Sequence, residues 1–289
     1  MANLSRKFRR SGQRKPPNTR PQVRRLPAKF EEKMSRLAVL GGFANHVSMN
    51  LAGLPTTKNG ELASMVFAKS CAHARSIGAI AIESPMFDHH AIMSLARMIL
   101  EASTMIAYLL DPVDEEQQRF RYTVLKLHDT VNRLKLLRGF GAEADDLRRG
   151  RDELKLEIVS SSAFSELAED RKKRVLSGEE IYVIGMRAVS KKIMGWNEEN
   201  FSSVYAYLSA HAHSSPMSYM RMREHEIDYY FPSEAQYDIL SLSMEVAEAC
   251  LRRSMLRMID CHPERIDDYN IHLLKDARED DGRCPFFMT

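Results

Sequence analysis

Arg97 and Glu101 are the residues whose type and spacing point most clearly to chemistry. They lie four positions apart in residues 91–110, AIMSLARMILEASTMIAYLL, where no other residue is charged. On a helix, residues four apart share one face, so we expect the guanidinium and the carboxylate to pair. The pair could bind an anion or hold a catalytic histidine in place. Alternatively, it is a core ion pair that fixes the helix register.

A second set of polar side chains lies in residues 205–216, YAYLSAHAHSSP. Tyr205, Ser209 and His213 are spaced four apart, so we expect one polar stripe along a helix. Histidine titrates near neutral pH, so the stripe could carry acid–base chemistry, with Tyr205 and Ser209 binding substrate. The alternative is a hydrogen-bonded stripe in the core. His211 is two positions from His213 and is expected to point to roughly the opposite side.

Side chains of the metal-ligand type occur at residues 88–90, Asp-His-His, and at residues 224–226, Glu-His-Glu. Neighbouring residues diverge on a helix, so His89 and His90 are not expected to share an ion. The Glu-x-x-His motif of di-iron bundles does not occur in the sequence. We therefore predict no metal site. The sequence also lacks a P-loop, a GxGxxG after a strand and a GxSxG, so we predict no cofactor.

These candidate residues need a scaffold, and residues 91–110 are predicted to form its central helix. A segment that is apolar nearly all round is typical of a helix buried on most sides. Its length would also suit a membrane span, but Arg97 and Glu101 sit in the middle, where each would cost several kcal/mol in lipid. Asp88 is the expected N-cap, and Asp111-Pro112 predicts the end of the helix.

The rest of the sequence predicts more helices and no sheet. Hydrophobic residues make up 44% of the 289-residue chain, and alternating, strand-like runs are almost absent. We predict an all-α fold with a single bundle of seven or eight helices over residues 29–276. The proline-punctuated residues 1–28 are expected to be a disordered basic arm. Residues 277–289 are expected to be a loose C-terminal tail.

The N-terminal arm has a charge of its own. From Leu4 to Lys29 the chain has ten Lys or Arg residues and no acidic residue. The rest of the chain then has 32 basic against 39 acidic residues, a formal charge of −7. The arm could bind RNA through phosphate contacts. Alternatively, it is a solvated tail that keeps the protein soluble.

The four cysteines show no CxxC pair and no regular spacing: Cys71, Cys250, Cys261 and Cys284. This pattern is typical of free thiols in a reducing compartment. The N-terminus has no apolar h-region of a secretory signal. We therefore expect a cytoplasmic protein with no membrane partner.

Two motifs together resemble a known family. The first is LARMILEA, which holds Arg97 and Glu101, and the second is YAYLSAHAH, which holds Tyr205, Ser209 and His213. In an uncharacterised bacterial helical group, domain-of-unknown-function family 5677, an Arg-x-x-x-Glu helix likewise precedes a Tyr-x-x-x-Ser-x-x-x-His element. The resemblance rests on these five positions.

By architecture, that group is similar to the HEPN class of α-helical domains. This class includes metal-independent ribonucleases and toxin or phage-defence components. The resemblance implies that Arg97 contacts phosphate and that His213 transfers protons. The usual HEPN motif is Arg-polar-x-x-x-His on one helix. Arg257 and His262 have that spacing, but Met258 stands where a polar residue is expected, which argues against ribonuclease activity.

Two functional hypotheses follow. In the first, the protein is a HEPN-like RNA-acting enzyme in which His213 is the acid–base, Arg97 stabilises phosphate charge and Glu101 orients Arg97. In the second, it is a non-enzymatic helical interaction or scaffold module, able to form a homodimer, and the Arg-Glu-His cluster is structural. Exposure separates the two, because an active site must open to solvent whereas a structural network can be sealed in the core.

Overall fold

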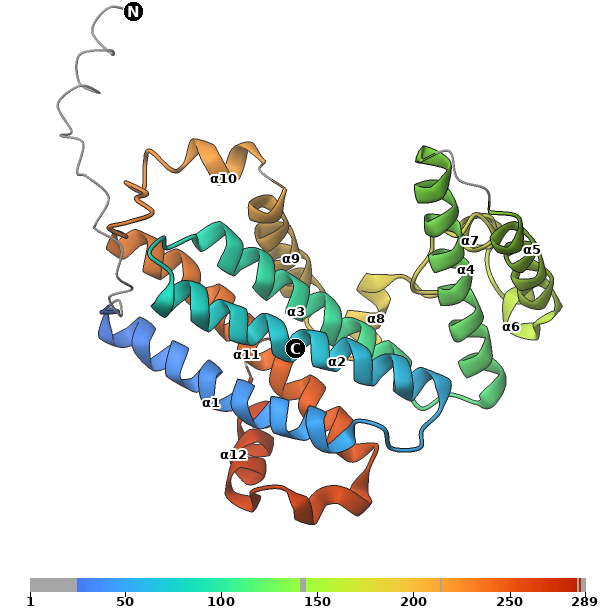
Figure 1. Cartoon of the computed structure of the whole chain (residues 1–289), viewed down its shortest axis with the longest axis horizontal. Coiled ribbons are helices and arrows are strands. Elements are labelled where there is room, and N and C mark those ends of the chain that lie inside the picture. The colour runs from blue at the N-terminus through green and yellow to red at the C-terminus, as the bar shows by residue number, and fades with distance from the viewer. Residues whose placement is uncertain (1–24, 141–143, 214, 285, 287–289) are drawn as a thin grey trace, which may run out of the picture.

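The computed structural model describes residues 25–140, 144–213, 215–284 and 286, and every regular element within them is a helix (Figure 1). The all-α class predicted from the sequence is therefore confirmed. The expected disordered arm lies outside the described residues up to residue 24. The first helix begins at Ala28.

The main bundle is built from the long helices α1 (Ala28–Leu51), α2 (Lys58–Gly78), α3 (His89–Leu109), α9 (Glu198–Ala212) and α11 (Glu234–Asp260). α3 lies in the middle and packs against α2, α9 and α11 (Figure 1). α1 packs against α2 and α11. The candidate residues of the sequence therefore lie on two neighbouring helices, α3 and α9.

α3 is the central helix that the sequence predicts. The Asp88 carboxylate caps it by accepting a hydrogen bond from the backbone N–H of Ala91 at 3.0 Å. By length and composition alone, α3 would suit a membrane span. However, 67% of its most apolar window is buried within the protein. Its apolar surface is thus covered by neighbouring helices.

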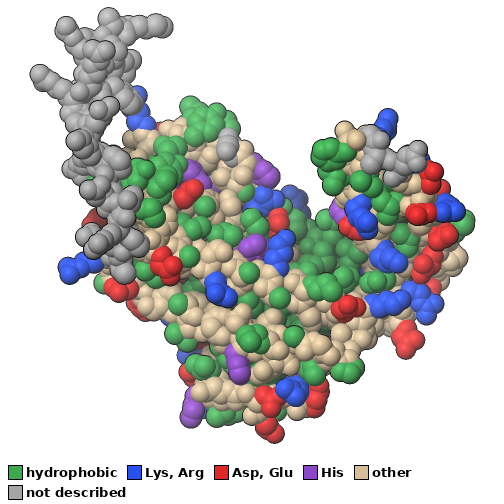
Figure 2. Space-filling view, in the orientation of Figure 1, with side chains coloured by type: hydrophobic (Ala, Val, Ile, Leu, Met, Phe, Trp, Pro, Cys, Tyr) green, Lys and Arg blue, Asp and Glu red, His purple; other side chains and the backbone are tan. Residues whose placement is uncertain are grey.

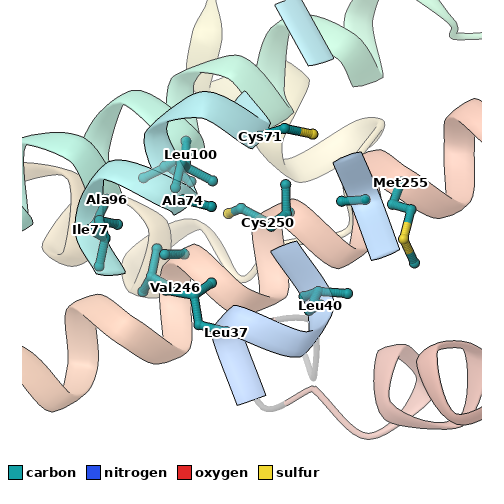
Figure 3. Packing of buried hydrophobic residues seen from close by; sticks show 14 of the residues in the cluster. Leu37, Leu40, Cys71, Ala74, Ile77, Ala96, Leu100, Val246, Cys250 and Met255 are labelled. Carbon is teal, nitrogen blue, oxygen red and sulfur yellow. The ribbon is translucent and has the colours of Figure 1, made fainter. Parts of the chain in front are cut away.

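Side chains of α1, α2, α3 and α11 meet in one hydrophobic core (Figure 3). Cys71 and Cys250 lie in this core. Burial raises the pKa of the Cys71 thiol to about 12 and also raises the pKa of Cys250. Both thiols are therefore protonated at neutral pH and pack as small apolar groups. All four cysteines are free, as the sequence predicts.

A second group of helices, here called the side lobe, projects from the main bundle (Figure 1). It consists of α4 (Glu115–Gly139), α5 (Asp145–Ser160), α6 (Ser162–Ser165) and α7 (Glu169–Leu176). These helices enclose a smaller hydrophobic cluster, which also contains Tyr108 from the end of α3. Figure 2 shows a hollow between the side lobe and the main bundle, with hydrophobic side chains on its floor.

The segment after α7 departs most from the sequence-based expectation. A capping box predicts one helix over residues 177–194, and this prediction is wrong. Ser177 instead ends α7, and Gly178 turns the chain with a φ of 73°. Glu180, which the capping box would need, is buried and pairs with two arginines of α7 at 2.7 and 2.8 Å.

Shorter helices complete the described residues: α8 (Met186–Lys192), α10 (Pro216–Met220), α12 (Ile271–Gly282), the π-helical Ala79–Glu83 and the 3₁₀-helical Pro263–Asp268. The described residues thus form twelve α-helices rather than seven or eight, because the charged region breaks into several short ones. α12 continues six residues past the boundary expected at residue 276. Ala277 and Cys284 are buried, so part of the expected tail packs on the bundle.

Candidate functional site

Four of the five residues named in the sequence motifs meet where α3 and α9 pack together. Arg97 Nη2 donates a hydrogen bond to the Tyr205 hydroxyl at 3.0 Å, and this hydroxyl donates to Glu101 Oε1 at 3.0 Å. Arg97 Nη2 also lies 2.8 Å from Glu101 Oε1. The expected ion pair therefore forms, and Tyr205 ties it to α9.

His213 completes this arrangement from the end of α9. Its Nε2 lies 2.7 Å from Arg97 Nη1. A guanidinium only donates, so Nε2 accepts in this contact, and the neutral ring then carries its proton on Nδ1. α9 ends at Ala212, and His213 has a non-helical φ of −108° and ψ of 16°. We refer to Arg97, Glu101, Tyr205 and His213 as the α3–α9 network.

The α3–α9 network is open to solvent at one end. The side chains of Arg97 and Glu101 are 16% and 37% exposed, and His213 is an exposed residue. Burial lowers the pKa of Arg97, but the hydrogen bond with Tyr205 and the charge of Glu101 outweigh it, so the pKa is raised overall. The network therefore holds a permanent cation beside an accessible imidazole.

The inner end of the network approaches the side lobe. Burial raises the pKa of Tyr182, and the carboxylate of Glu101 raises it further, so the phenol stays protonated. The Tyr182 ring packs edge-on against Tyr108, with 5.3 Å between the ring centroids. The sequence does not single out Tyr182. The capping box predicts a helix over residues 177–194, and a helix there gives no reason to place Tyr182 beside Glu101.

Ser209 is not a hydrogen-bonded member of the α3–α9 network. Its hydroxyl is buried and has no hydrogen-bond partner among the described residues. Its backbone carbonyl accepts from the His213 N–H at 3.1 Å. In this structure, Ser209 therefore helps to shape the end of α9.

A histidine cluster lies two helical turns before Arg97 on α3. His90 Nδ1 is 2.9 Å from His211 Nδ1, and the ring centroids of His89 and His90 are 3.9 Å apart. The expectation that the two neighbouring histidines diverge is wrong, since no preceding turn restricts rotamers at the start of a helix. From the sequence, His211 and His213 are also expected on opposite sides of one helix. Both reach α3, because His213 lies beyond the helical part of α9.

The HEPN-type spacing at Arg257 and His262 does not bring these two side chains together. Arg257 Nη2 donates to the backbone carbonyl that follows α8 at 2.7 Å. Burial lowers the pKa of Arg257. His262 Nδ1 instead lies 3.3 Å from Glu264 Oε1. The arginine and histidine that do meet, Arg97 and His213, come from two helices.

The α3–α9 network combines an anion-binding group with a proton carrier. An arginine pairs with phosphate oxygens through its planar set of donors. An imidazole nitrogen with a free lone pair can accept a proton from a substrate. Glu101 and Tyr205 fix the orientation of the guanidinium, which is the role of supporting contacts in a preorganised site.

Residues 60–229 match the model of a family described as a family of unknown function (DUF5677). The match spans more than half of the chain and includes the whole α3–α9 network and the histidine cluster. No curated protein and no solved structure matches the chain.

Proposed function

The chain belongs to DUF5677, a family of unknown function, and from the α3–α9 network we propose that it is a metal-independent ribonuclease. One observation carries the proposal. Arg97 Nη1 and His213 Nε2 lie 2.7 Å apart, and His213 is exposed to solvent. We further propose a HEPN-like site in which the arginine and the histidine come from two helices.

In the proposed reaction, the substrate phosphate first competes for the guanidinium. Tyr205 and Glu101 hold Nη2 of Arg97, whereas Nη1 faces His213. A contact between a guanidinium and a phosphate is charge-assisted and is stronger than one with a neutral imidazole. The phosphate therefore takes over Nη1 and releases the Nε2 lone pair of His213.

The released His213 then acts as a general base. Its Nε2 takes the proton of the ribose 2′-hydroxyl, and the 2′ oxygen attacks the adjacent phosphorus. The P–O5′ bond breaks, the 5′ oxygen leaves with a proton from solvent, and a 2′,3′-cyclic phosphate remains. Arg97 stabilises the negative charge that builds up on the non-bridging oxygens.

Two further features support RNA as the substrate. The basic arm, residues 1–28, offers phosphate contacts that do not depend on sequence. The Ser209 hydroxyl, which has no hydrogen-bond partner among the described residues, lies four positions from both Tyr205 and His213, and we assign it a contact with a substrate oxygen. With the HEPN likeness, the proposal extends to a cytoplasmic toxin or phage-defence component.

The proposal is tested by cleavage of a defined single-stranded RNA with EDTA present. We expect the wild type to cleave, and His213→Ala and Arg97→Ala to be slower by at least about 100-fold. Glu101→Gln removes the charge that orients the guanidinium and should cost about 10-fold. His272→Ala removes an exposed histidine of α12 and should cleave like the wild type.

Circular dichroism and thermal melting establish whether each variant is folded. Cleavage that persists in folded His213→Ala and Arg97→Ala would contradict the assigned residues. If the wild type does not cleave and both variants melt early, the network serves only to stabilise the fold. The chain would then be a helical interaction or scaffold module.

A further inference from the structure

The histidine cluster at the start of α3 has the composition of a metal centre. One ligand nitrogen from each of His89, His90 and His211 lies within 4.8 Å of the other two. We propose that these three side chains bind a divalent transition-metal ion, with Zn²⁺ as the best match. The site is separate from the α3–α9 network, because the seven residues from His90 to Arg97 span about 10 Å of helix.

The spacing of the His90 and His211 nitrogens is close to that of coordinated ligands. His90 Nδ1 and His211 Nδ1 are 2.9 Å apart. Two nitrogens bound to one tetrahedral Zn²⁺ at about 2.0–2.1 Å lie about 3.4 Å from each other. Small rotations of the two imidazoles, which move each nitrogen by less than about half an ångström, therefore bring the pair to ligand spacing.

Hydrogen bonding within the cluster leaves one nitrogen unsatisfied. The contact between His90 and His211 uses one donor and one acceptor. His89 Nδ1 is buried and has no hydrogen-bond partner among the described residues. Buried polar atoms almost always have a partner, and those that do not call for an explanation such as an ion. A metal ion on the three rings provides that explanation.

The protonation state of the cluster also suits a metal. Burial lowers the pKa of His89 and of His211 to about 4, and it lowers the pKa of His90 as well. The three imidazoles are therefore neutral at pH 7, which is the form that binds metal. Zn²⁺ matches because it favours nitrogen ligands in tetrahedral geometry. Three histidines leave a fourth position for water or an anion.

A metal here would fasten the start of α3 to the end of α9, beside the segment that holds Tyr229. His89 and His90 begin α3, and His211 lies in the last turn of α9. The Tyr229 ring lies 6.0 Å from the His89 ring, and the Tyr229 carbonyl accepts from the Phe87 N–H at 2.6 Å. The site therefore joins segments that are far apart in the sequence.

Zinc binding is measured by calorimetric titration of the full chain after treatment with a chelator and dialysis. We expect one ion per chain for the wild type. His90→Ala and His211→Ala should each bind at least about 100-fold more weakly, since even an outer-shell change costs 10- to 100-fold. His272→Ala is the matched control and should bind like the wild type. Circular dichroism reports the fold of each variant.

Co²⁺ gives a second, spectroscopic readout of the ligands. Tetrahedral nitrogen coordination should produce visible d–d absorption on the wild type and on His272→Ala, and none on the two cluster variants. A thiolate charge-transfer band in the near ultraviolet would place the ion on cysteines and overturn the proposal. No binding by the wild type, or binding that both cluster variants retain, would mean that the His90–His211 contact is only a hydrogen bond.

Discussion

Tyr205 makes two hydrogen bonds at once in the α3–α9 network. Its hydroxyl accepts from Arg97 and donates to Glu101, and the Arg97 guanidinium carbon lies 5.1 Å from the centre of its ring. The guanidinium is thus fixed at Nη2, while Nη1 remains directed at the exposed His213. At the level of single residues, orienting contacts and the proposed reactive contact therefore use different nitrogens.

Tyr108 provides a pH test of the contact between α3 and the side lobe. Its hydroxyl accepts from the Val183 N–H at 3.2 Å, and burial raises its pKa from 10.0 to about 12. The folded state therefore holds this proton more tightly than the unfolded state. The protonated Tyr108 hydroxyl therefore contributes its full stabilisation below pH 10, and this contribution is lost as the pH rises towards 12. A shift of this size corresponds to about 2–3 kcal/mol.

We expect denaturant titrations to show this loss between about pH 10 and about pH 12. Tyr108→Phe cannot ionise at this position, so its free energy of unfolding should fall less over the same range. Part of the fall should remain, because burial also raises the pKa of Tyr182. The same alkaline loss in the variant and the wild type would contradict the assignment to Tyr108.

The residues of the α3–α9 network could be predicted, but the histidine cluster could not. The four-residue spacing of Arg97 and Glu101 and the eight-residue spacing of Tyr205 and His213 already place each pair on a common helix face. His90 and Arg97 are seven residues apart, so the sequence also predicts that they share one face of α3. The contact of His90 with His211 depends on where α9 crosses α3, which spacing within one helix does not determine.

The turn that follows α7 is the element that leads the chain from the side lobe back to the bundle. Gly178 adopts a φ of 73°, and a Cβ built there would lie 2.7 Å from Val131 Cγ2. The Gly178 carbonyl accepts from His128 Nδ1 at 2.9 Å. A side chain at this position meets both an unfavourable backbone conformation and a steric clash with α4.

Gly178→Ala should therefore lower the free energy of unfolding by about 1–3 kcal/mol. Gly42→Ala is the matched control, because Gly42 is an exposed helical residue with no atom within 4 Å of the added Cβ. It should raise the free energy of unfolding by about 0.5–1 kcal/mol. Urea unfolding measures both changes. Equal effects of the two substitutions would show that the turn is not a strained position.

Long helices could be predicted where local signals agree. The sequence predicts Asn197 and Ser233 as helix caps, and they do cap α9 and α11. In the structure, Ser233 also forms a capping box with Gln236. The same type of pattern failed at Ser177 and Glu180. There the carboxylate pairs with two arginines of α7, and this tertiary contact outweighs the local capping pattern. Charged segments are difficult to assign for this reason.

Across the whole molecule, α3 connects the two hydrophobic clusters. Most of its buried side chains belong to the main core, whereas Tyr108 belongs to the cluster of the side lobe. Met105, Met186 and Ile193 pack against both clusters. Unfolding of the side lobe would therefore expose part of the bundle.

We predict that the main bundle and the side lobe unfold together as one domain. Scanning calorimetry should show one transition, with equal calorimetric and van't Hoff enthalpies. Two separate transitions, or a calorimetric enthalpy well above the van't Hoff value, would instead indicate two domains.

The chemical identity of the RNA ends decides whether the Arg97–His213 pair is catalytic. Mass spectrometry of the cleavage products made with EDTA present measures it. We predict 2′,3′-cyclic phosphate and 5′-hydroxyl ends from the wild type, and at least about 100-fold less of this product from His213→Ala in the same time. Ends that carry a 5′-phosphate, or equal cleavage of a 2′-O-methyl RNA of the same sequence, would contradict attack by the 2′-hydroxyl and the role of His213 as its base.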